Sequence, residues 1–315
     1  MRISGWLLGI TTLFLLPLDP VRAATPAVDR TLPWVTDEVR LPRVVFRTFA
    51  SAVVGREVSY HAYLPEQYDH SEQRLPVLYW LHGTEGGTSG IRPLAKLFGD
   101  AMAAGRMPPM IVVFVNGLPR RLWADAKDGS APVETVFITE LIPEVDRSFR
   151  TVASREGRIL EGFSMGGYGA ARLGLKYPQS FAGISILAGG PFDLDLQGPR
   201  AQRNPRLREE LLREVCGGEL DYFRQISPWE IAGAAASSIR SHRAVIRQAV
   251  GTRDDTRALN KMFHARLQSL HIPHDYREVP DVAHEPRRLL ERLLELDGDF
   301  YARALGRQRS ASSPK

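Results

Sequence analysis

Residues 158–167 read RILEGFSMGG, and this stretch decides the fold prediction. Its first half is apolar enough for a buried strand, and the residues from Gly169 to Tyr177 have helical spacing. Ser164 stands between them with glycines two positions before and two after, which fits a sharp strand-to-helix turn because glycine removes side chains that would clash there. The stretch therefore predicts an exposed, nucleophilic hydroxyl at Ser164.

Alternating strands and helices surround this turn. Nearly continuous apolar runs and β-branched segments predict strands at 44–54, 58–64, 76–81, 110–115, 181–187, 244–250 and 275–279. Helical spacing predicts helices at 92–104, 136–149, 257–270 and 286–304. Strands that alternate with helices form a mostly parallel central sheet with helices on both faces. The predicted fold class is therefore α/β.

Residues 193–243 do not follow this alternation. They include a charged helical segment at 206–214, so we expect a helical insertion over the strand ends, which is a candidate lid. Together with this insertion, the alternating strands and helices fit one catalytic domain at 43–306. An extended lead-in at 24–42 precedes it, and we expect the short polar tail at 307–315 to be disordered.

The first 23 residues have the pattern of a signal peptide. Arg2 supplies the positive start, an apolar run extends from Trp6 to Leu18, and Ala23 provides a small residue at the cleavage site. The apolar run is shorter than the roughly 20 residues that span a bilayer. We expect a periplasmic or secreted protein with no membrane span after cleavage, and retention as an uncleaved anchor is the alternative.

The composition excludes several classes of protein. The net charge of +5 is spread along the chain and not gathered on one stripe, so we expect no nucleic-acid partner. A single cysteine, Cys216, excludes an internal disulfide and a cysteine-rich metal site, and predicts a buried free thiol. The chain has neither a zinc-protease motif nor a phosphate-binding loop, so we expect no metal and no cofactor.

A serine nucleophile needs a histidine base, and that base needs an acid to orient it. After a turn of this kind the acid comes next in the chain and the histidine last. Only His284 falls in the loop between the last predicted strand and the last predicted helix, where the base belongs. The other later histidines lie in or beside predicted helices and strands: His242, His264, His271 and His274.

The acid should follow the strand before that loop. Residues 251–255 read GTRDD and follow the predicted strand at 244–250 directly. We choose Asp254 as the acid and keep Asp255 as its rival, since one of the two can cap the next helix while the other serves His284.

The negative oxygen that forms during ester cleavage must also be held. One donor is the backbone N–H that follows the nucleophile, at Met165, and we assign the second to the N–H of Thr84, in the loop after the strand at 76–81. His82 could be mistaken for a base, but we expect its ring to brace this loop.

Four other residues have two interpretations each. Trp123 and Trp229 lie in loops near the expected cleft, where stacking on a sugar or an aromatic acyl group competes with packing in the core or lid. Packing is the more common role. Asp193 and Asp195 could bind an ion, but we expect them to be ordinary loop acids.

At these residues the chain resembles the esterase family that includes feruloyl esterase catalytic domains, S-formylglutathione hydrolases, enterochelin esterases and mycolyltransferases. The segments that carry the resemblance are 63–68, 75–83, 140–146, 162–169, 176–181 and 251–254. The resemblance implies the α/β-hydrolase fold, with Ser164, Asp254 and His284 as a catalytic triad and Thr84 and Met165 as oxyanion donors. One residue departs from the family pattern, because Ala283 stands where the family usually has glycine before the histidine.

The expected function is an exported serine esterase that hydrolyses carboxylic esters, including carbohydrate-linked acyl or feruloyl esters, through an acyl-enzyme on Ser164. One alternative is an acyltransferase that passes the acyl group to a sugar or another alcohol. A second is a catalytically silent carbohydrate- or envelope-binding module. The expected partner is a small-molecule or carbohydrate ester, and the pattern carries no prediction of the oligomeric state.

Overall fold

The structure, a computed structural model, describes residues 28–306, so the predicted signal peptide at 1–23 and the tail at 307–315 lie outside the described residues. A single eight-stranded sheet with the order β1-β2-β4-β3-β5-β6-β7-β8 crosses this part of the chain. The strands are β1 (Val44–Ser51), β2 (Arg56–Tyr63), β3 (Val77–Leu81), β4 (Ile111–Val115), β5 (Arg158–Phe163), β6 (Gly183–Leu187), β7 (Val245–Gly251) and β8 (Asp275–Val279). All neighbours from β4 to β8 are parallel, and β2 pairs antiparallel with both β1 and β4.

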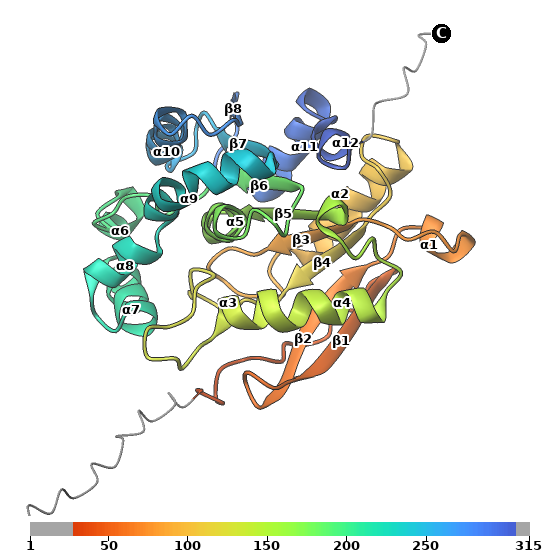
Figure 1. Ribbon diagram of the computed structural model, residues 1–315, viewed down its shortest axis with the longest axis horizontal. Coiled ribbons are helices and arrows are strands. Elements are labelled where there is room, and N and C mark those ends of the chain that lie inside the picture. The colour runs from red at the N-terminus through yellow and green to blue at the C-terminus, as the bar shows by residue number, and fades with distance from the viewer. Residues whose placement is uncertain (1–27, 307–315) are drawn as a thin grey trace, which may run out of the picture.

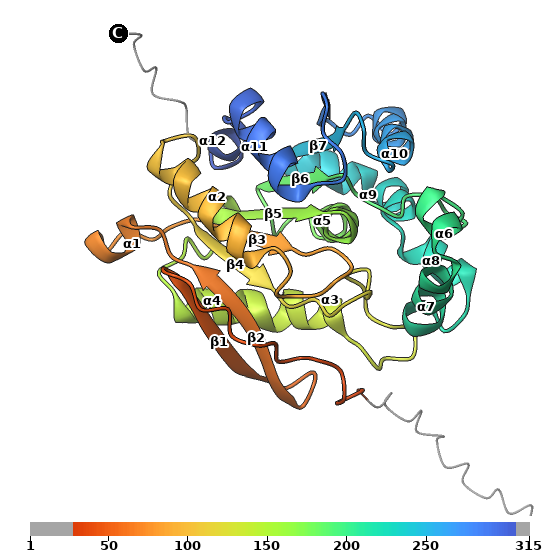
Figure 2. The same cartoon turned by 180° about the vertical axis from the view of Figure 1, so that it is seen from behind.

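Helices cover both faces of the sheet (Figures 1 and 2). One face carries α2 (Ile91–Ala103), α11 (Pro286–Leu296) and α12 (Phe300–Ala304). The opposite face carries α3 (Val133–Thr135), the π-helical η1 (Val136–Leu141), α4 (Ile142–Ser148), α5 (Met165–Lys176), α9 (Pro228–His242) and α10 (Arg257–Ser269). Two short elements lie outside these layers, α1 (Gln67–His70) and the 3-10 turn η2 (Arg155–Gly157). This is the mostly parallel sheet with helices on both faces that the alternation of strands and helices predicted, and it agrees with the α/β-hydrolase fold that the family resemblance implied.

Buried strands explain why two separate cores form. Along β3, Tyr79 and Leu81 pack into the core under α5, whereas Leu78 and Trp80 pack into the core under α2 and α11. Successive side chains of a strand point to opposite faces, so a run that is apolar at every position must be covered on both sides.

The insertion after β6 contains α6 (Pro199–Arg203), α7 (Pro205–Cys216) and α8 (Leu220–Ile226), gathered at one side of the molecule (Figure 1). The predicted helical insertion near 193–243 therefore exists. Its last helix, α9, packs along α5 and so belongs to the layer that covers the sheet.

The prediction of one continuous helix at 286–304 is wrong. Asp297, Gly298 and Asp299 separate α11 from α12, and the carboxylate of Asp297 faces Arg247 and Arg303 across this break. The amphipathic spacing continues on both sides of residues 297–299. The sequence pattern alone therefore does not show that the helix is interrupted there.

A buried ion pair ties β5, the strand that precedes Ser164, to the neighbouring elements. Glu161 on β5 accepts a hydrogen bond of 3.0 Å from Arg247 on β7 and another from the hydroxyl of Tyr301 on α12. Glu161 is fully buried and Arg247 almost so. Burial raises the pKa of Glu161 even beside this guanidinium. A buried carboxylate without its partner would be strongly destabilising. The contacts of Glu161 with Arg247 and Tyr301 therefore fix the positions of β5, β7 and α12 relative to one another.

Within residues 28–306 no helix is both long enough and apolar enough to cross a membrane.

The lead-in packs on the sheet, where Trp34 is fully buried and the backbone N–H of Val39 donates to Nε2 of His61 at 3.0 Å.

Candidate active site

Ser164 occupies the turn between β5 and α5 in a strained backbone conformation, with φ 60° and ψ −120°. The flanking glycines are required by close packing. A Cβ on Gly162 would overlap the carbonyl group of Gly166, and a Cβ on Gly166 would overlap the carbonyl oxygen of Leu81. Strain of this kind persists only where the surroundings fix the backbone, and here the neighbouring strands do so.

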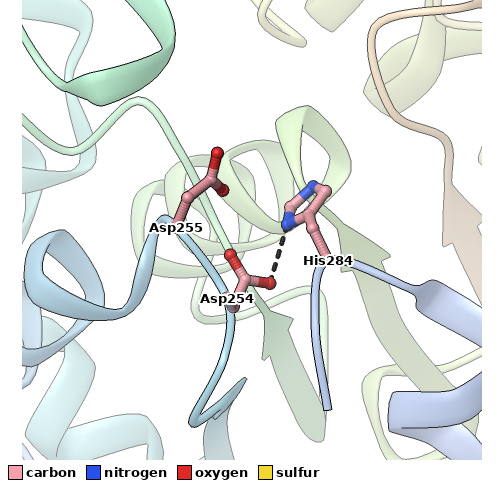
Figure 3. Close-up of side chains that lie close together, drawn as sticks. All are labelled: Asp254, Asp255 and His284. Atoms are coloured by element: carbon pink, nitrogen blue, oxygen red, sulfur yellow. Dashed lines mark hydrogen bonds and ion pairs between the residues drawn. The ribbon is translucent and has the colours of Figure 1, made fainter.

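His284 and Asp254 meet at the same edge of the sheet, as Figure 3 shows. Nδ1 of His284 and Oδ2 of Asp254 are 2.7 Å apart, a hydrogen-bond distance. Asp254 follows β7 and His284 follows β8. The carboxyl ends of parallel strands share one edge of a sheet, so residues 30 positions apart in sequence come together.

Both carboxylate oxygens of Asp254 have hydrogen-bond partners. Its Oδ1 accepts hydrogen bonds of 2.8 Å from both the backbone N–H and the hydroxyl of Thr256. Its side chain is fully buried, whereas the ring of His284 is one-fifth exposed and lies against Phe163 with 4.4 Å between ring centroids. The carboxylate therefore fixes the orientation of the histidine ring.

Asp255, the rival acid, points to the insertion. Its carboxylate pairs with Arg200 at 2.9 Å and also with Arg203, both on α6. Burial opposes ionisation of Asp255, but the hydrogen bond and charge of Arg200 keep the pKa of Asp255 below its usual range. The structure therefore brings Asp254, and not Asp255, into hydrogen-bond contact with His284.

Asp254, Asp255 and His284 also offer possible metal-ligating atoms within 4.8 Å of one another. The arginines on Asp255 oppose a cation at this place, because two guanidinium groups already neutralise that carboxylate. Nδ1 of His284 is hydrogen-bonded to Asp254 as well. The three residues fit a hydrogen-bonded histidine–carboxylate pair better than a metal centre.

The hydroxyl of Ser164 accepts a hydrogen bond from Nη1 of Arg200 at 3.3 Å. Nε2 of His284 is buried and has no hydrogen-bond partner among the described residues. Within residues 28–306 no hydrogen bond joins Ser164 to His284. The serine is thus held by an arginine that the sequence pattern did not identify.

Arg200 has no recognisable signal in the sequence. It is one of several arginines in the insertion, and its contacts with Ser164 and Asp255 span 36 and 55 residues. Only the folded arrangement of the insertion brings Arg200 to Ser164 and Asp255.

The predicted oxyanion donors lie beside Ser164, since Thr84, Met165 and Ser164 line one cavity. In the described part of the chain the backbone N–H groups of Thr84 and Met165 donate to no acceptor. His82 braces the loop as predicted: its Nε2 accepts from the N–H of Gly117 at 3.0 Å. Burial lowers the pKa of His82 to about 4, which keeps the ring neutral near pH 7.

The structure also places the remaining candidates. Trp123 is fully buried, and its indole N–H donates to the carbonyl of His82 at 3.2 Å, so it packs behind the oxyanion loop. Trp229 packs on Phe263 and under the guanidinium of Arg266.

The loop acids Asp193 and Asp195 pair with groups of the protein itself, and the lone cysteine Cys216 is buried. Asp193 accepts hydrogen bonds from the backbone N–H groups of Gln197 and Gly198, and Asp195 pairs with Arg224. Cys216 is the buried free thiol that the sequence predicted, and burial raises its pKa to about 12.

Known proteins resemble this chain in sequence. The model of the "Putative esterase" family matches residues 51–277. An esterase of Mycobacterium tuberculosis is 30% identical over 262 residues, which cover 76% of this chain and 55% of that protein. An endo-1,4-beta-xylanase/feruloyl esterase of Xylanibacter ruminicola is 34% identical over 164 residues, which cover 49% of this chain and 23% of that protein. The chain thus spans about half the length of its M. tuberculosis relative.

Solved structures share the fold. A ferulic acid esterase superposes with a TM-score of 0.66 at 22% identity, covering 83% of this chain and 98% of that chain. An S-formylglutathione hydrolase from Agrobacterium tumefaciens gives a TM-score of 0.65 at 18% identity, covering 84% and 95%. Together with the family match, which extends over more than half of the sequence, these results show that the chain belongs to the "Putative esterase" family and has the α/β-hydrolase fold.

Proposed function

We propose that this protein is a serine esterase that hydrolyses carboxylic esters through an acyl-enzyme on Ser164. The observation that carries the proposal is the contact between Nδ1 of His284 and Asp254 at 2.7 Å, while Nε2 of the same ring is buried with no hydrogen-bond partner among the described residues. The ring lies against Phe163, next to the strained backbone of Ser164. Membership in the esterase family and the names of the relatives support the same reaction class.

The first half of the proposed reaction forms the acyl-enzyme. The Ser164 hydroxyl turns from Arg200 toward Nε2 of His284 when substrate binds, since catalytic hydrogen bonds are often long or poorly aligned without substrate. His284 takes the proton as Ser164 attacks the ester carbonyl, and Asp254 stabilises the imidazolium that forms. The N–H groups of Thr84 and Met165 hold the negative oxygen, and His284 then protonates the departing alcohol.

The second half returns the free enzyme. His284 removes a proton from water, which attacks the acyl-enzyme, and Ser164 leaves with that proton. These steps use only side chains and backbone N–H groups of this chain. No step draws on a metal or a cofactor.

We also propose that the protein is exported and acts on esters in the periplasm or outside the cell. The basis is the pattern of residues 1–23, with Arg2, the apolar run and Ala23. Carbohydrate-linked acyl esters are suitable candidates there, because the Xylanibacter ruminicola relative carries both a xylanase and a feruloyl esterase in its name.

The test compares the mature protein with its Ser164→Ala variant on p-nitrophenyl acetate and on a fluorophosphonate label. We expect kcat/KM to fall by at least about four orders of magnitude and labelling to disappear. Ser154→Ala, at an exposed position outside the site, is the matched control and should keep full activity. A wild-type protein that is inert on every ester and resists the label would refute the esterase assignment.

A further inference from the structure

A small cavity opens directly beside Ser164. Its volume is about 90 Å³, and its wall includes Met165 and Thr84 on one side and residues of the insertion on the other. The insertion contributes the loop that follows β6 together with α6 and α7, and α10 contributes Leu259. The cavity is therefore built where the framework of the sheet meets the insertion.

The wall of this cavity is largely aliphatic. Five leucines line it, and they come from four separate segments of the chain: Leu122, Leu196, Leu207, Leu211 and Leu259. The described lining residues contain no aromatic ring. Such a wall favours a saturated hydrocarbon group, because it gains from burial of apolar surface and offers no ring for stacking.

The charged residues in the wall already have protein partners. Arg208 donates to the carbonyl of Leu196 at 3.1 Å. Arg200 is paired with Asp255, and the carboxylate of Asp193 is occupied by two backbone N–H groups. A ligand in this cavity therefore needs no polar group beyond its ester carbonyl.

The position of the cavity identifies which half of the ester it holds. His284 must protonate the leaving alcohol, so the alcohol has to lie on the side of Nε2. The cavity is lined by Ser164, Met165 and Thr84 but not by His284. A group in the cavity is thus attached to the carbonyl on the side away from the leaving oxygen, which makes it the acyl group.

We propose that this leucine-lined cavity is the acyl pocket and that it selects short aliphatic acyl groups, from acetyl to butyryl, over hydroxycinnamoyl groups. The proposal rests on the proposed esterase function and adds its substrate class. The cavity is smaller than the roughly 150 Å³ that hold a benzene ring in an engineered apolar cavity. A substituted aromatic acyl group is larger still.

The first experiment varies the acyl group on a constant alcohol, with p-nitrophenyl acetate, butyrate, octanoate and ferulate as substrates. We expect kcat/KM to be highest for acetate or butyrate and lower by about tenfold or more for octanoate and ferulate. A preference for ferulate or octanoate in the wild-type enzyme would overturn the proposal while leaving the esterase function intact.

The second experiment changes the size of the pocket. Leu207 and Leu259 are only half-buried, so their replacement disturbs the core less than that of Leu211. We expect Leu207→Ala to raise the octanoate-to-acetate ratio of kcat/KM by about tenfold, and Leu207→Trp to lower the butyrate-to-acetate ratio by a similar factor. If Leu207→Trp does not fold, Leu259→Phe makes the same test from α10.

Two controls separate a pocket effect from a general one. Leu220→Ala and Leu220→Trp change a half-buried leucine on α8 that does not line the cavity, and both should keep the wild-type acyl profile. On a series of acetate esters with different alcohols, the order and ratios of the kcat/KM values should be the same in the wild type and in the Leu207 variants. A shift in alcohol preference with an unchanged acyl profile would show that the cavity holds the alcohol, which overturns the proposal. An enzyme inert on all esters and unlabelled by a fluorophosphonate would instead remove the proposed function itself.

Discussion

The turn at Ser164 and the insertion build the same cavity by different means. At the turn, position is set by the backbone: the flanking glycines pack against carbonyl groups of β3 and of the first turn of α5, and Ser164 between them has a strained conformation. In the insertion, position is set by side chains, such as the arginines of α6 that reach Asp255. In the proposed enzyme the rigid sheet thus places the chemistry, and short helices that can vary without disturbing the sheet shape the proposed substrate pocket.

The boundary between the two regions passes between adjacent residues. Asp254 faces His284 and is buried with Thr256, whereas Asp255 faces Arg200 and Arg203 on the insertion. Two consecutive carboxylates therefore serve different regions, and their replacement separates chemistry from pocket architecture.

The largest expected effect comes from Asp254→Asn. An amide in this place can donate a hydrogen bond to Nδ1 and so favour the wrong tautomer of His284, so we expect kcat to fall by about three to four orders of magnitude. Asp255→Asn should lower kcat by less than about tenfold, because that carboxylate touches the insertion and not the histidine. Steady-state kinetics on p-nitrophenyl acetate measures both.

Equal losses in the two variants would contradict the division between them. A larger loss for Asp255→Asn would make Asp255 the catalytic acid. Circular dichroism of both variants distinguishes a local effect from unfolding, since Asp254 is also hydrogen-bonded to Thr256.

The next effect is on stability. Gly166→Ala places a methyl group on the carbonyl oxygen of Leu81, and neither backbone segment can move without disturbing the sheet. We expect a loss of about 3 kcal/mol or more in the free energy of unfolding. Gly83→Ala is the matched control, because its Cβ would meet Ser164 and Phe163 only at 3.7 and 3.8 Å, which is ordinary contact. Urea unfolding of the two variants gives the comparison, and similar midpoints would show that the turn is less rigid than its packing implies.

The sequence predicted the features that depend on local patterns. The strand, glycine and helix signals around Ser164 lie within 20 residues, and the order of strands placed Asp254 and His284 at one edge. The choice between Asp254 and Asp255 needed the structure, because adjacent residues share every local pattern and differ only in the direction of their side chains.

Long-range side-chain contacts could not be predicted from the same patterns. Arg200 reaches Ser164 across 36 residues, and Arg247 pairs with Glu161 across 86, so neither partner leaves a mark near the other. Trp123 had two interpretations from sequence, and only its burial behind His82 decided for packing. The five leucines of the proposed acyl pocket come from segments that meet only in the folded protein.

The smallest expected effect per residue is acid destabilisation of the framework, to which two histidines contribute. Burial lowers the pKa of both His61 and His82 from 6.5 to about 4, so below pH 6.5 the unfolded chain binds protons that the folded protein refuses. Stability is therefore lost as the pH falls from 6.5 toward 4, by about tenfold in the unfolding equilibrium per pH unit and histidine. The lowered pKa of Asp255 keeps the ion pairs of the insertion intact over this range.

Urea midpoints at pH 7 and pH 5 test this difference between the framework and the insertion. His61→Gln removes one of the two titrating groups while its amide oxygen can still accept the hydrogen bond from the N–H of Val39. The variant should lose less stability between pH 7 and pH 5 than the wild type, because its unfolding takes up about one proton fewer. An unchanged pH dependence would mean that His61 is protonated equally in the folded and unfolded chain, and its burial under the lead-in would then not be maintained in solution.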